Sequence, residues 1–139
     1  MPTDLIDQCT AMLRVRIGAG EAHYGGDLVD GARMLRLFGD VVTEIAIRTD
    51  GDEGLLSHYT DVSFTAPVHA GDFIEVTGRM TEKSRLRRVV ELEARKVIEA
   101  RYEQGHTTAG VLDEPVVVCR ALGVVVVPVH KARRRALTA

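Results

Sequence analysis

The sequence contains no tryptophan, only three phenylalanines and three tyrosines, and only two cysteines among its 139 residues. Cys9 and Cys119 form neither a CxxC pair nor a Cys/His metal spacing, which argues against a disulfide framework or a zinc module. We expect both to be reduced thiols of a cytoplasmic protein. The net charge of −2 argues against a general nucleic-acid-binding protein, whose domain would be clearly basic.

Long apolar runs are missing as well. The first residues carry Asp4 and Asp7 and no continuous apolar stretch, so they do not predict a secretory signal. The most apolar segment, residues 116–129, is interrupted by Arg120 and falls short of the roughly 20 residues that span a membrane. The length predicts a single domain over residues 1–139, with about residues 1–11 as a lead-in and about 130–139 as a solvated tail.

One segment has helical periodicity. Apolar residues recur at spacings of three and four from Leu28 to about Ile47, which predicts a helix of about five turns. Asp27 is expected to cap its start, because a side-chain oxygen at that position can accept the free N–H groups of the first turn. The segment Thr49–Asp52 is a typical stop signal.

Strand patterns precede and follow this helix. Each is a short run of alternating or continuous apolar residues bounded by a turn. The polar stretch 99–114 is expected to be a mobile loop. One long helix among strands predicts an α+β fold. The expected strands cover residues 13–17, 55–64, 73–80, 88–98 and 116–129.

Several motifs resemble enzymes that act on coenzyme A thioesters. Phe64–Asp72 (FTAPVHAGD) is similar to the F-x-x-P-V-x-x-G-D turn between strands of the hotdog fold. Ala22–Ala32 (AHYGGDLVDGA) and Gly39–Ile45 (GDVVTEI) resemble the β-aminoacyl-CoA ammonia lyases, as do Asp50–Asp52 and Pro115–Ala121. The resemblance covers nearly the whole domain. It implies a hotdog fold, in which a curled antiparallel sheet wraps one long central helix.

The resemblance also implies an activity: reversible elimination of ammonia from a short β-aminoacyl-CoA, either 3-aminobutyryl-CoA or β-alanyl-CoA, to give a 2-enoyl-CoA. No cofactor is expected, since coenzyme A is part of the substrate, and the histidines show no metal spacing. We expect a homodimer or a higher homo-oligomer, with Val116–Val127 as an interface strand. Two alternatives stay open: an acyl-CoA thioesterase and a non-enzymatic acyl-CoA-binding module.

The chemistry calls for a group that stabilises charge on the thioester oxygen. Negative charge develops there as the α-carbon loses its proton, and backbone N–H groups at a helix N-terminus can bind it. Gly25, Gly26 and Asp27 are the candidates, because they precede the predicted helix; the alternative is a simple tight turn. Tyr24 is a candidate substrate-binding residue, with packing beneath the helix as its alternative.

An acid–base group is also required, and His23, Asp40 and Glu44 are candidates. Asp40 and Glu44 are four residues apart and therefore share one face of the predicted helix. They could equally form surface ion pairs with Arg36 and Arg48. The corner that carries His23 also resembles hotdog dehydratases, which eliminate water from related thioesters.

A basic bend is predicted between two of the strands. Guanidinium and ammonium groups bind phosphate well, and in hotdog proteins such a bend commonly lies near the coenzyme A entrance of a neighbouring subunit. The alternative is a solvated hairpin. The candidate ligands of the coenzyme A phosphates are Lys83, Arg85, Arg87 and Arg88.

Overall fold

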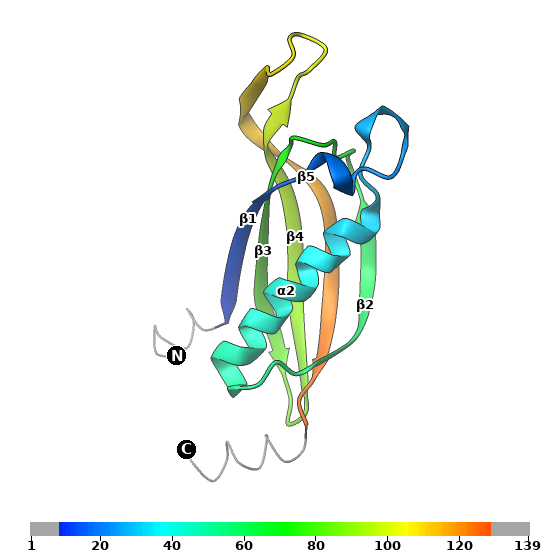
Figure 1. The fold of residues 1–139 in the computed structure, drawn as a ribbon. Helices are drawn as coiled ribbons and strands as arrows, with labels where there is room; N and C mark the ends of the chain where they lie inside the picture. Colours follow the sequence, from blue (N-terminus) through cyan, green and yellow to red (C-terminus); the bar gives the residue numbers. More distant parts are fainter. Residues whose placement is uncertain (1–8, 129–139) are drawn as a thin grey trace.

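A computed structural model describes residues 9–128, which form one long helix packed against one antiparallel sheet (Figure 1). The predicted α+β class is therefore confirmed. Two short 3-10 turns, η1 and η2, lie between the first strand and the helix. The elements are β1 (Thr10–Arg16), η1 (Ala19–Glu21), η2 (Gly25–Asp27), α2 (Gly31–Asp50), β2 (Leu55–Phe64), β3 (Phe73–Lys83), β4 (Arg87–Ala100) and β5 (Ala109–Val126).

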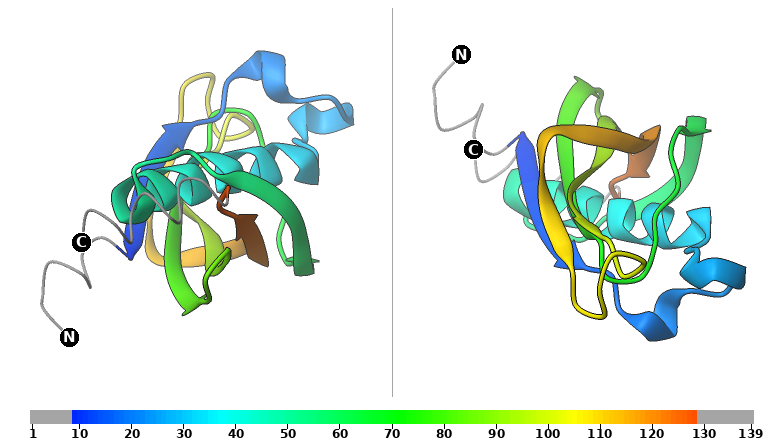
Figure 2. Two further views of the ribbon diagram at one scale, coloured as in Figure 1. Left: turned by 90° about the horizontal axis from the view of Figure 1, so that it is seen from below. Right: turned by 90° about the horizontal axis from the view of Figure 1, so that it is seen from above.

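The five strands are ordered β1-β3-β4-β5-β2, and all neighbouring pairs are antiparallel. The sheet curls around α2, which crosses it diagonally on one face (Figures 1 and 2). It is open, with β1 and β2 as its edges. This is the hotdog arrangement that the sequence motifs imply. No helix within residues 9–128 has the length and hydrophobicity required to cross a membrane.

The helix begins three residues later than predicted. Asp30, rather than Asp27, is the N-cap, and its side chain accepts a hydrogen bond from the backbone N–H of Arg33. Leu28 is drawn into extended backbone by an antiparallel bridge with His69, so it cannot start the helix. Gly51 ends α2 in a left-handed conformation with φ 67°, which glycine adopts without steric cost.

The core lies between one face of α2 and the concave face of the sheet. Gly78 allows the two to approach closely, since a Cβ at that position would come within 2.5 Å of the Val41 side chain. In packing this close, adding a single methyl group at Gly78 would change the stability of the fold. The buried residues of α2 are Met34, Leu37, Phe38, Val41, Val42, Ile45, Ala46, Thr49 and Asp50.

Half of the predicted mobile loop, 99–114, is strand. β4 continues to Ala100 and β5 begins at Ala109, so only residues 101–108 connect them. The two strands form a long hairpin whose tip projects beyond the rest of the sheet (Figure 1). Cross-strand pairing reaches Ala100 and Ala109, and it overrides the polar composition that suggested a loop. The predicted tail, 130–139, lies outside the described residues.

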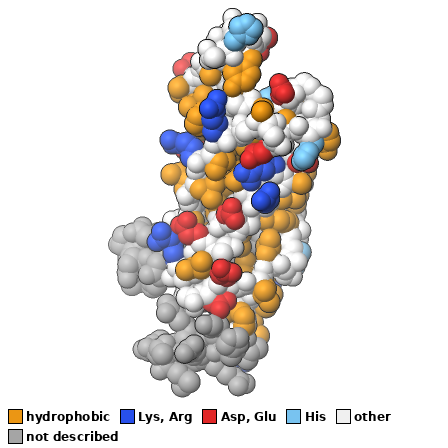
Figure 3. Space-filling view, in the orientation of Figure 1, with side chains coloured by type: hydrophobic (Ala, Val, Ile, Leu, Met, Phe, Trp, Pro, Cys, Tyr) orange, Lys and Arg blue, Asp and Glu red, His pale blue; other side chains and the backbone are white. Residues whose placement is uncertain are grey.

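The free edge at β2 was not foreseen. β5 lies inside the sheet between β4 and β2, so an interface through the predicted strand Val116–Val127 would have to use a face of the strand and not its edge. Nine of the ten residues of β2 are exposed, and hydrophobic side chains reach the surface along the side of the molecule that β2 occupies (Figure 3). The exposed large hydrophobic residues of β2 are Leu55, Leu56, Val62 and Phe64.

Candidate active site

The glycine-rich corner docks on the F-x-x-P-V-x-x-G-D turn. Asp27 accepts a hydrogen bond at its backbone oxygen from the N–H of Ala70 (2.9 Å), and the N–H of Val29 donates to the oxygen of Val68 (2.8 Å). Gly26 and Asp27 both have positive φ, 71° and 58°, a conformation that favours Gly and Asp. Two motifs far apart in the sequence thus form a single structural unit.

A buried carboxylate holds this unit in place. The Asp72 side chain accepts hydrogen bonds from the N–H groups of His69 (2.8 Å) and Ala100 (2.9 Å), and it pairs with the Lys96 ammonium at 3.2 Å. It is fully buried. Gly71 has φ 92°, and a side chain there would collide with Tyr102. The Gly-Asp pair of the motif therefore fixes the turn; the sequence analysis recognised the pair as part of the motif but assigned neither residue a role.

A hollow of about 590 Å³ opens beside the corner. It lies between the η2 turn, the turn before β3 and the base of the β4–β5 hairpin. That volume suits part of a small-molecule ligand. Its lining residues include Gly26, Asp27, His69, Glu99 and Glu103, so two of the three predicted carbonyl-binding residues border it.

His23 and Tyr24 lie on the open surface of the same corner. Both side chains are exposed, Tyr24 by 58%. Tyr24 therefore does not pack beneath the helix within this chain, although packing was the alternative to substrate binding. The corner places both residues beside Gly25, Gly26 and Asp27, as the sequence spacing required.

Asp40 and Glu44 have different surroundings although they share a helix. Glu44 forms an exposed ion pair with Arg48 at 2.9 Å, as the surface-pair alternative predicted, and borders a separate hollow of about 650 Å³ beside β1 and β3. Asp40 has no hydrogen bond or ion pair within residues 9–128, so the alternative pair with Arg36 does not form. Asp40 instead lies near Tyr59 of β2, and the negative charge of Asp40 contributes to the raised pKa of the Tyr59 hydroxyl.

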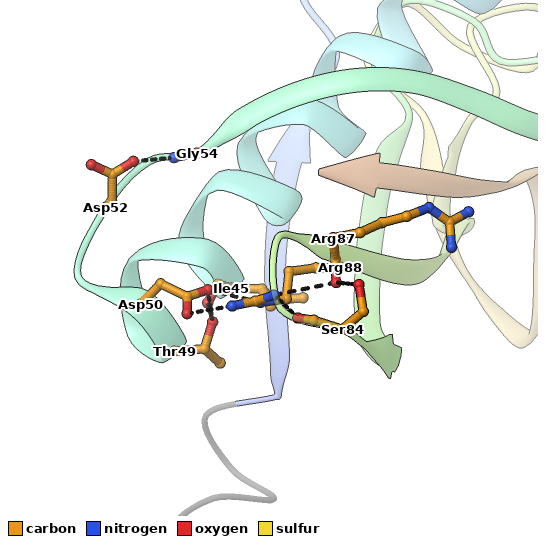
Figure 4. Close-up of polar contacts among 8 residues, drawn as sticks. All are labelled: Ile45, Thr49, Asp50, Asp52, Gly54, Ser84, Arg87 and Arg88. Carbon is orange, nitrogen blue, oxygen red and sulfur yellow. Dashed lines mark hydrogen bonds and ion pairs between the residues drawn. The ribbon is translucent and has the colours of Figure 1, made fainter. Parts of the chain in front are cut away.

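Arg88 does not belong with the other basic residues of the bend. Its guanidinium pairs with Asp50 at 2.9 Å and also donates to the backbone oxygens of Ser84 and Arg87 (Figure 4). The side chains of Arg88 and Asp50 are only 5% and 4% exposed. We therefore correct its predicted role: Arg88 is a buried structural residue, and a phosphate would have to displace its carboxylate partner.

The remaining basic residues stay on the surface. Lys83 and Arg85 are exposed, and Arg87 is 54% exposed with Glu82 3.7 Å away. This bend lies at the C-terminal end of α2, whereas the glycine-rich corner precedes its N-terminal end. A helix of 20 residues is about 30 Å long. One chain therefore does not bring the two predicted binding regions together.

Two further features concern metals and thiols. No three His, Cys, Asp or Glu side chains of the described part of the chain are grouped so that they could hold a metal ion. Cys9 and Cys119 are both unpaired thiols. Burial raises the pKa of the Cys119 thiol to about 11, so Cys119 stays protonated at neutral pH.

Known structures place this geometry in a class of proteins. The β-alanyl-CoA:ammonia lyase from Clostridium propionicum superposes with a TM-score of 0.83 at 33% identity, over 88% of this chain and 87% of that one. A hexameric acyl-CoA thioesterase superposes with a TM-score of 0.68 at 14% identity, over 88% and 72% of the two chains. The second match shows the fold alone. The fold is the hotdog fold of acyl-CoA enzymes.

A curated sequence narrows the class to a family. The chain is 54% identical to the 3-aminobutyryl-CoA ammonia lyase of Acetoanaerobium sticklandii over 124 residues, which cover 89% of this chain and 98% of that protein. No family model matches the sequence. The chain belongs to the β-aminoacyl-CoA ammonia lyase family, and the family predicted from its motifs is confirmed.

Proposed function

We propose that the protein is a carbon–nitrogen lyase that reversibly eliminates ammonia from 3-aminobutyryl-CoA to give a 2-enoyl-CoA. The observation that carries the proposal is the 54% identity to a 3-aminobutyryl-CoA ammonia lyase over nearly the full length of both chains. The identity to the β-alanyl-CoA enzyme is lower, 33%. For that reason we propose the substrate with the additional methyl group.

The reaction needs one base and one site for developing charge. The base removes the α-proton, the C–H electron pair moves toward the thioester carbonyl, and the enolate then expels the protonated amine as ammonia. In our proposal Asp40 is the base, since its carboxylate is exposed and unpaired within residues 9–128. Glu44 remains the second carboxylate candidate for the acid–base role, and His23 is proposed to be the acid–base group for the departing amine.

Within one chain Asp40 lies nine residues along α2 from Gly31, about 14 Å, so the backbone of Gly25, Gly26 and Asp27 of a second copy of the chain is proposed to bind the thioester oxygen, with Tyr24 of that copy against the acyl group. The support for this role is that Gly26 and Asp27 line the hollow; both have positive φ, which is not the backbone of a regular helix. Because α2 starts only at Gly31, the N–H groups would come from this turn and not from a helix N-terminus.

The coenzyme A nucleotide is proposed to bind Lys83, Arg85 and Arg87 of the copy that supplies Asp40, and not of the copy that supplies the glycine-rich corner. Two copies of the free strand β2 can pair antiparallel, and the resulting two-fold axis turns one chain end for end. The basic bend of one chain then comes to the end where the other carries its glycine-rich corner. We propose at least a homodimer; light scattering that finds only monomer at micromolar concentration would contradict it.

The enzyme is proposed to act without a cofactor and in the cytoplasm. The second point rests on two unpaired cysteines, which are typical of a reducing compartment. The proposed removal of the α-proton and release of the amine depend on neither of these two points.

The test is to mix purified protein with crotonyl-CoA and ammonium and to follow enoyl absorbance and product mass. We expect the absorbance to fall as an adduct heavier by one ammonia appears. Acrylyl-CoA should react more slowly, because one methyl group in a binding pocket is worth about 1–3 kcal/mol. Release of free coenzyme A without an ammonia adduct would make the protein a thioesterase and contradict the proposal.

A further inference from the structure

Tyr59 differs from every other residue of β2. The other nine residues of the strand are exposed, whereas Tyr59 is half-buried. The pairing of β2 with β5 is interrupted on both sides of it, between Leu56 and His58 and between Thr60 and Ser63. Such β-bulges redirect side chains and are frequent beside active sites. The Tyr59 side chain lies against α2, where its hydroxyl contacts Leu35.

Two glycines border the side chain of Tyr59. A Cβ at Gly39 of α2 would lie 3.7 Å from the Tyr59 hydroxyl, and a Cβ at Gly123 of β5 would lie 3.6 Å from its ring. Phe38 contacts the ring edge to face, with centroids 6.4 Å apart. The ring is thus held on three sides, which fixes the direction of its hydroxyl.

That hydroxyl donates a hydrogen bond to the backbone oxygen of Leu35 at 2.6 Å. In an α-helix the same oxygen also receives the N–H of Gly39, so Tyr59 is attached to the turn that ends immediately before Asp40. Burial, then the negative charge of Asp40, and at high pH that of the Cys119 thiolate, raise the pKa of Tyr59 to about 12. The hydroxyl therefore keeps its proton at any pH at which the enzyme would work.

We infer that Tyr59 is a positioning residue for Asp40: by binding Leu35 it fixes the helical turn that carries the proposed base against the edge strand. This inference rests on the proposed lyase function. The Tyr59 hydroxyl has a single proton, and it donates that proton in the hydrogen bond to the Leu35 oxygen. The phenol therefore donates nothing to the Asp40 carboxylate, whose oxygens remain open to accept the α-proton of the substrate.

The expected effect follows from geometry. Proton transfer requires donor and acceptor within hydrogen-bond reach, and a displacement of about 1 Å can lower a rate about 100-fold. The variant Tyr59→Phe keeps the ring between Gly39 and Gly123 and removes only the bond to Leu35. We expect kcat for ammonia addition to crotonyl-CoA to fall by about 10- to 100-fold, while KM changes little.

The control is Thr49→Val on the same helix. Thr49 also donates its hydroxyl to a helix carbonyl, that of Ile45 at 2.9 Å, and lies 3.0 Å from the Asp50 carboxylate. This variant therefore loses at least a comparable contact, two turns away from Asp40. It is expected to lower the melting temperature and to leave kcat unchanged. If Thr49→Val lowers kcat as much as Tyr59→Phe, the effect is general loosening of α2 and the inference is wrong.

A double variant separates positioning from mere structure. Residues that act as one unit are not additive, so Tyr59→Phe should cost little further activity in an Asp40→Asn background. An equal fold-loss in both backgrounds would overturn the inference, as would wild-type kcat in Tyr59→Phe.

Amide hydrogen exchange gives a readout that does not depend on turnover. The N–H groups of Gly39 and Asp40 should exchange faster in Tyr59→Phe than in wild type, and unchanged exchange would contradict the positioning role. Inactive wild-type protein with faster exchange in the variant would refute the lyase function and support the contact itself. The two failures are therefore distinguishable.

Discussion

Asp40 and Asp50 are two aspartates ten residues apart on one helix, and their surroundings are opposite. Asp50 is buried at the C-terminal end of α2, where its carboxylate accepts hydrogen bonds from the Arg88 guanidinium and the Thr49 hydroxyl (Figure 4). Asp40 is exposed halfway along the helix and has no hydrogen bond or ion pair in the described chain. The first carboxylate can only stabilise structure, while the second is open to a substrate.

The comparison shows that a residue type in a motif does not define its role. Both aspartates lie in segments that resemble the ammonia lyases. What separates them is whether a partner neutralises the carboxylate before a ligand arrives. A buried ion pair broken on one side costs much more than an exposed one, so substitutions at the two positions should separate catalysis from stability.

The largest effect is expected at Asp40. Asp40→Asn removes the proposed base, and loss of a general base typically lowers kcat about 100- to 10,000-fold. The melting temperature should stay that of wild type, because no partner of Asp40 is lost. The measurement is crotonyl-CoA amination together with thermal unfolding.

Two matched variants accompany Asp40→Asn. Glu53→Gln changes an exposed carboxylate of the loop after α2 and should leave both quantities unchanged. Glu44→Gln breaks the exposed pair with Arg48, which is worth about 0.3–0.5 kcal/mol. A larger kcat loss in Glu44→Gln than in Asp40→Asn would indicate that the base is Glu44, one helical turn further along α2, and not Asp40.

The opposite result is expected at Asp50. Asp50→Asn leaves the Arg88 charge buried without a carboxylate, a loss of about 3–5 kcal/mol in the free energy of unfolding. The kcat of the molecules that remain folded should not change. Asp52→Asn is the control, since an asparagine oxygen can still accept the Gly54 N–H that Asp52 Oδ1 accepts at 2.8 Å (Figure 4). Equal destabilisation by both variants would contradict the special role of the buried pair.

Sequence reasoning could have foreseen the Asp50–Arg88 pair but did not. Residues 90, 92 and 94 of β4 all point into the core, and Arg88 has the same parity, so the period of the strand already placed it inward. Instead, its neighbours in the basic bend suggested phosphate binding. An inward arginine near a strand end predicts a buried carboxylate partner, and Asp50 was available at the end of the helix.

Other features could not be predicted from local pattern. Asp27 and Asp30 are equally good caps by residue type, and the choice depends on the bridge between Leu28 and His69, a tertiary contact 41 residues apart. Tyr59 likewise contacts α2 through a tertiary hydrogen bond, to Leu35 24 residues earlier in the sequence. The fold and the family were predictable, because the motifs that imply them are runs of contiguous residues, whereas the docking of one motif on the other is a tertiary contact.

Acid should weaken the fold through groups of the Asp50 kind. Burial by itself raises the pKa of Asp50, but Arg88, Thr49 and the charge of Lys83 together outweigh it and lower that pKa. Hydrogen bonds from Arg14 (2.8 Å) and Arg95 (2.7 Å) lower the pKa of Glu75.

A lowered folded-state pKa contributes stability above the unfolded carboxyl value of about 4. That contribution is lost as the pH falls through the folded-state values. We expect the urea midpoint to drop below about pH 4, with a shallower drop in Asp50→Asn. Glu103→Gln, at the exposed hairpin tip, should follow the wild-type curve; an identical acid limb in all three proteins would show that the buried pair is not involved.

The smallest effect is expected at the exposed end of the same bend that contains Arg88. Lys83 and Arg85 are free to meet a phosphate, whereas Arg88 is not, so Lys83→Ala and Arg85→Ala should each raise KM about two- to five-fold, as expected for exposed charges worth up to about 1 kcal/mol. With the corresponding pantetheine thioester, which lacks the nucleotide phosphates, neither variant should differ from wild type. Arg79→Ala removes another exposed arginine of β3, 3.8 Å from Glu91, and should leave KM unchanged with either substrate. A KM increase that persists with the pantetheine thioester would mean that these residues act on the fold and not on the nucleotide.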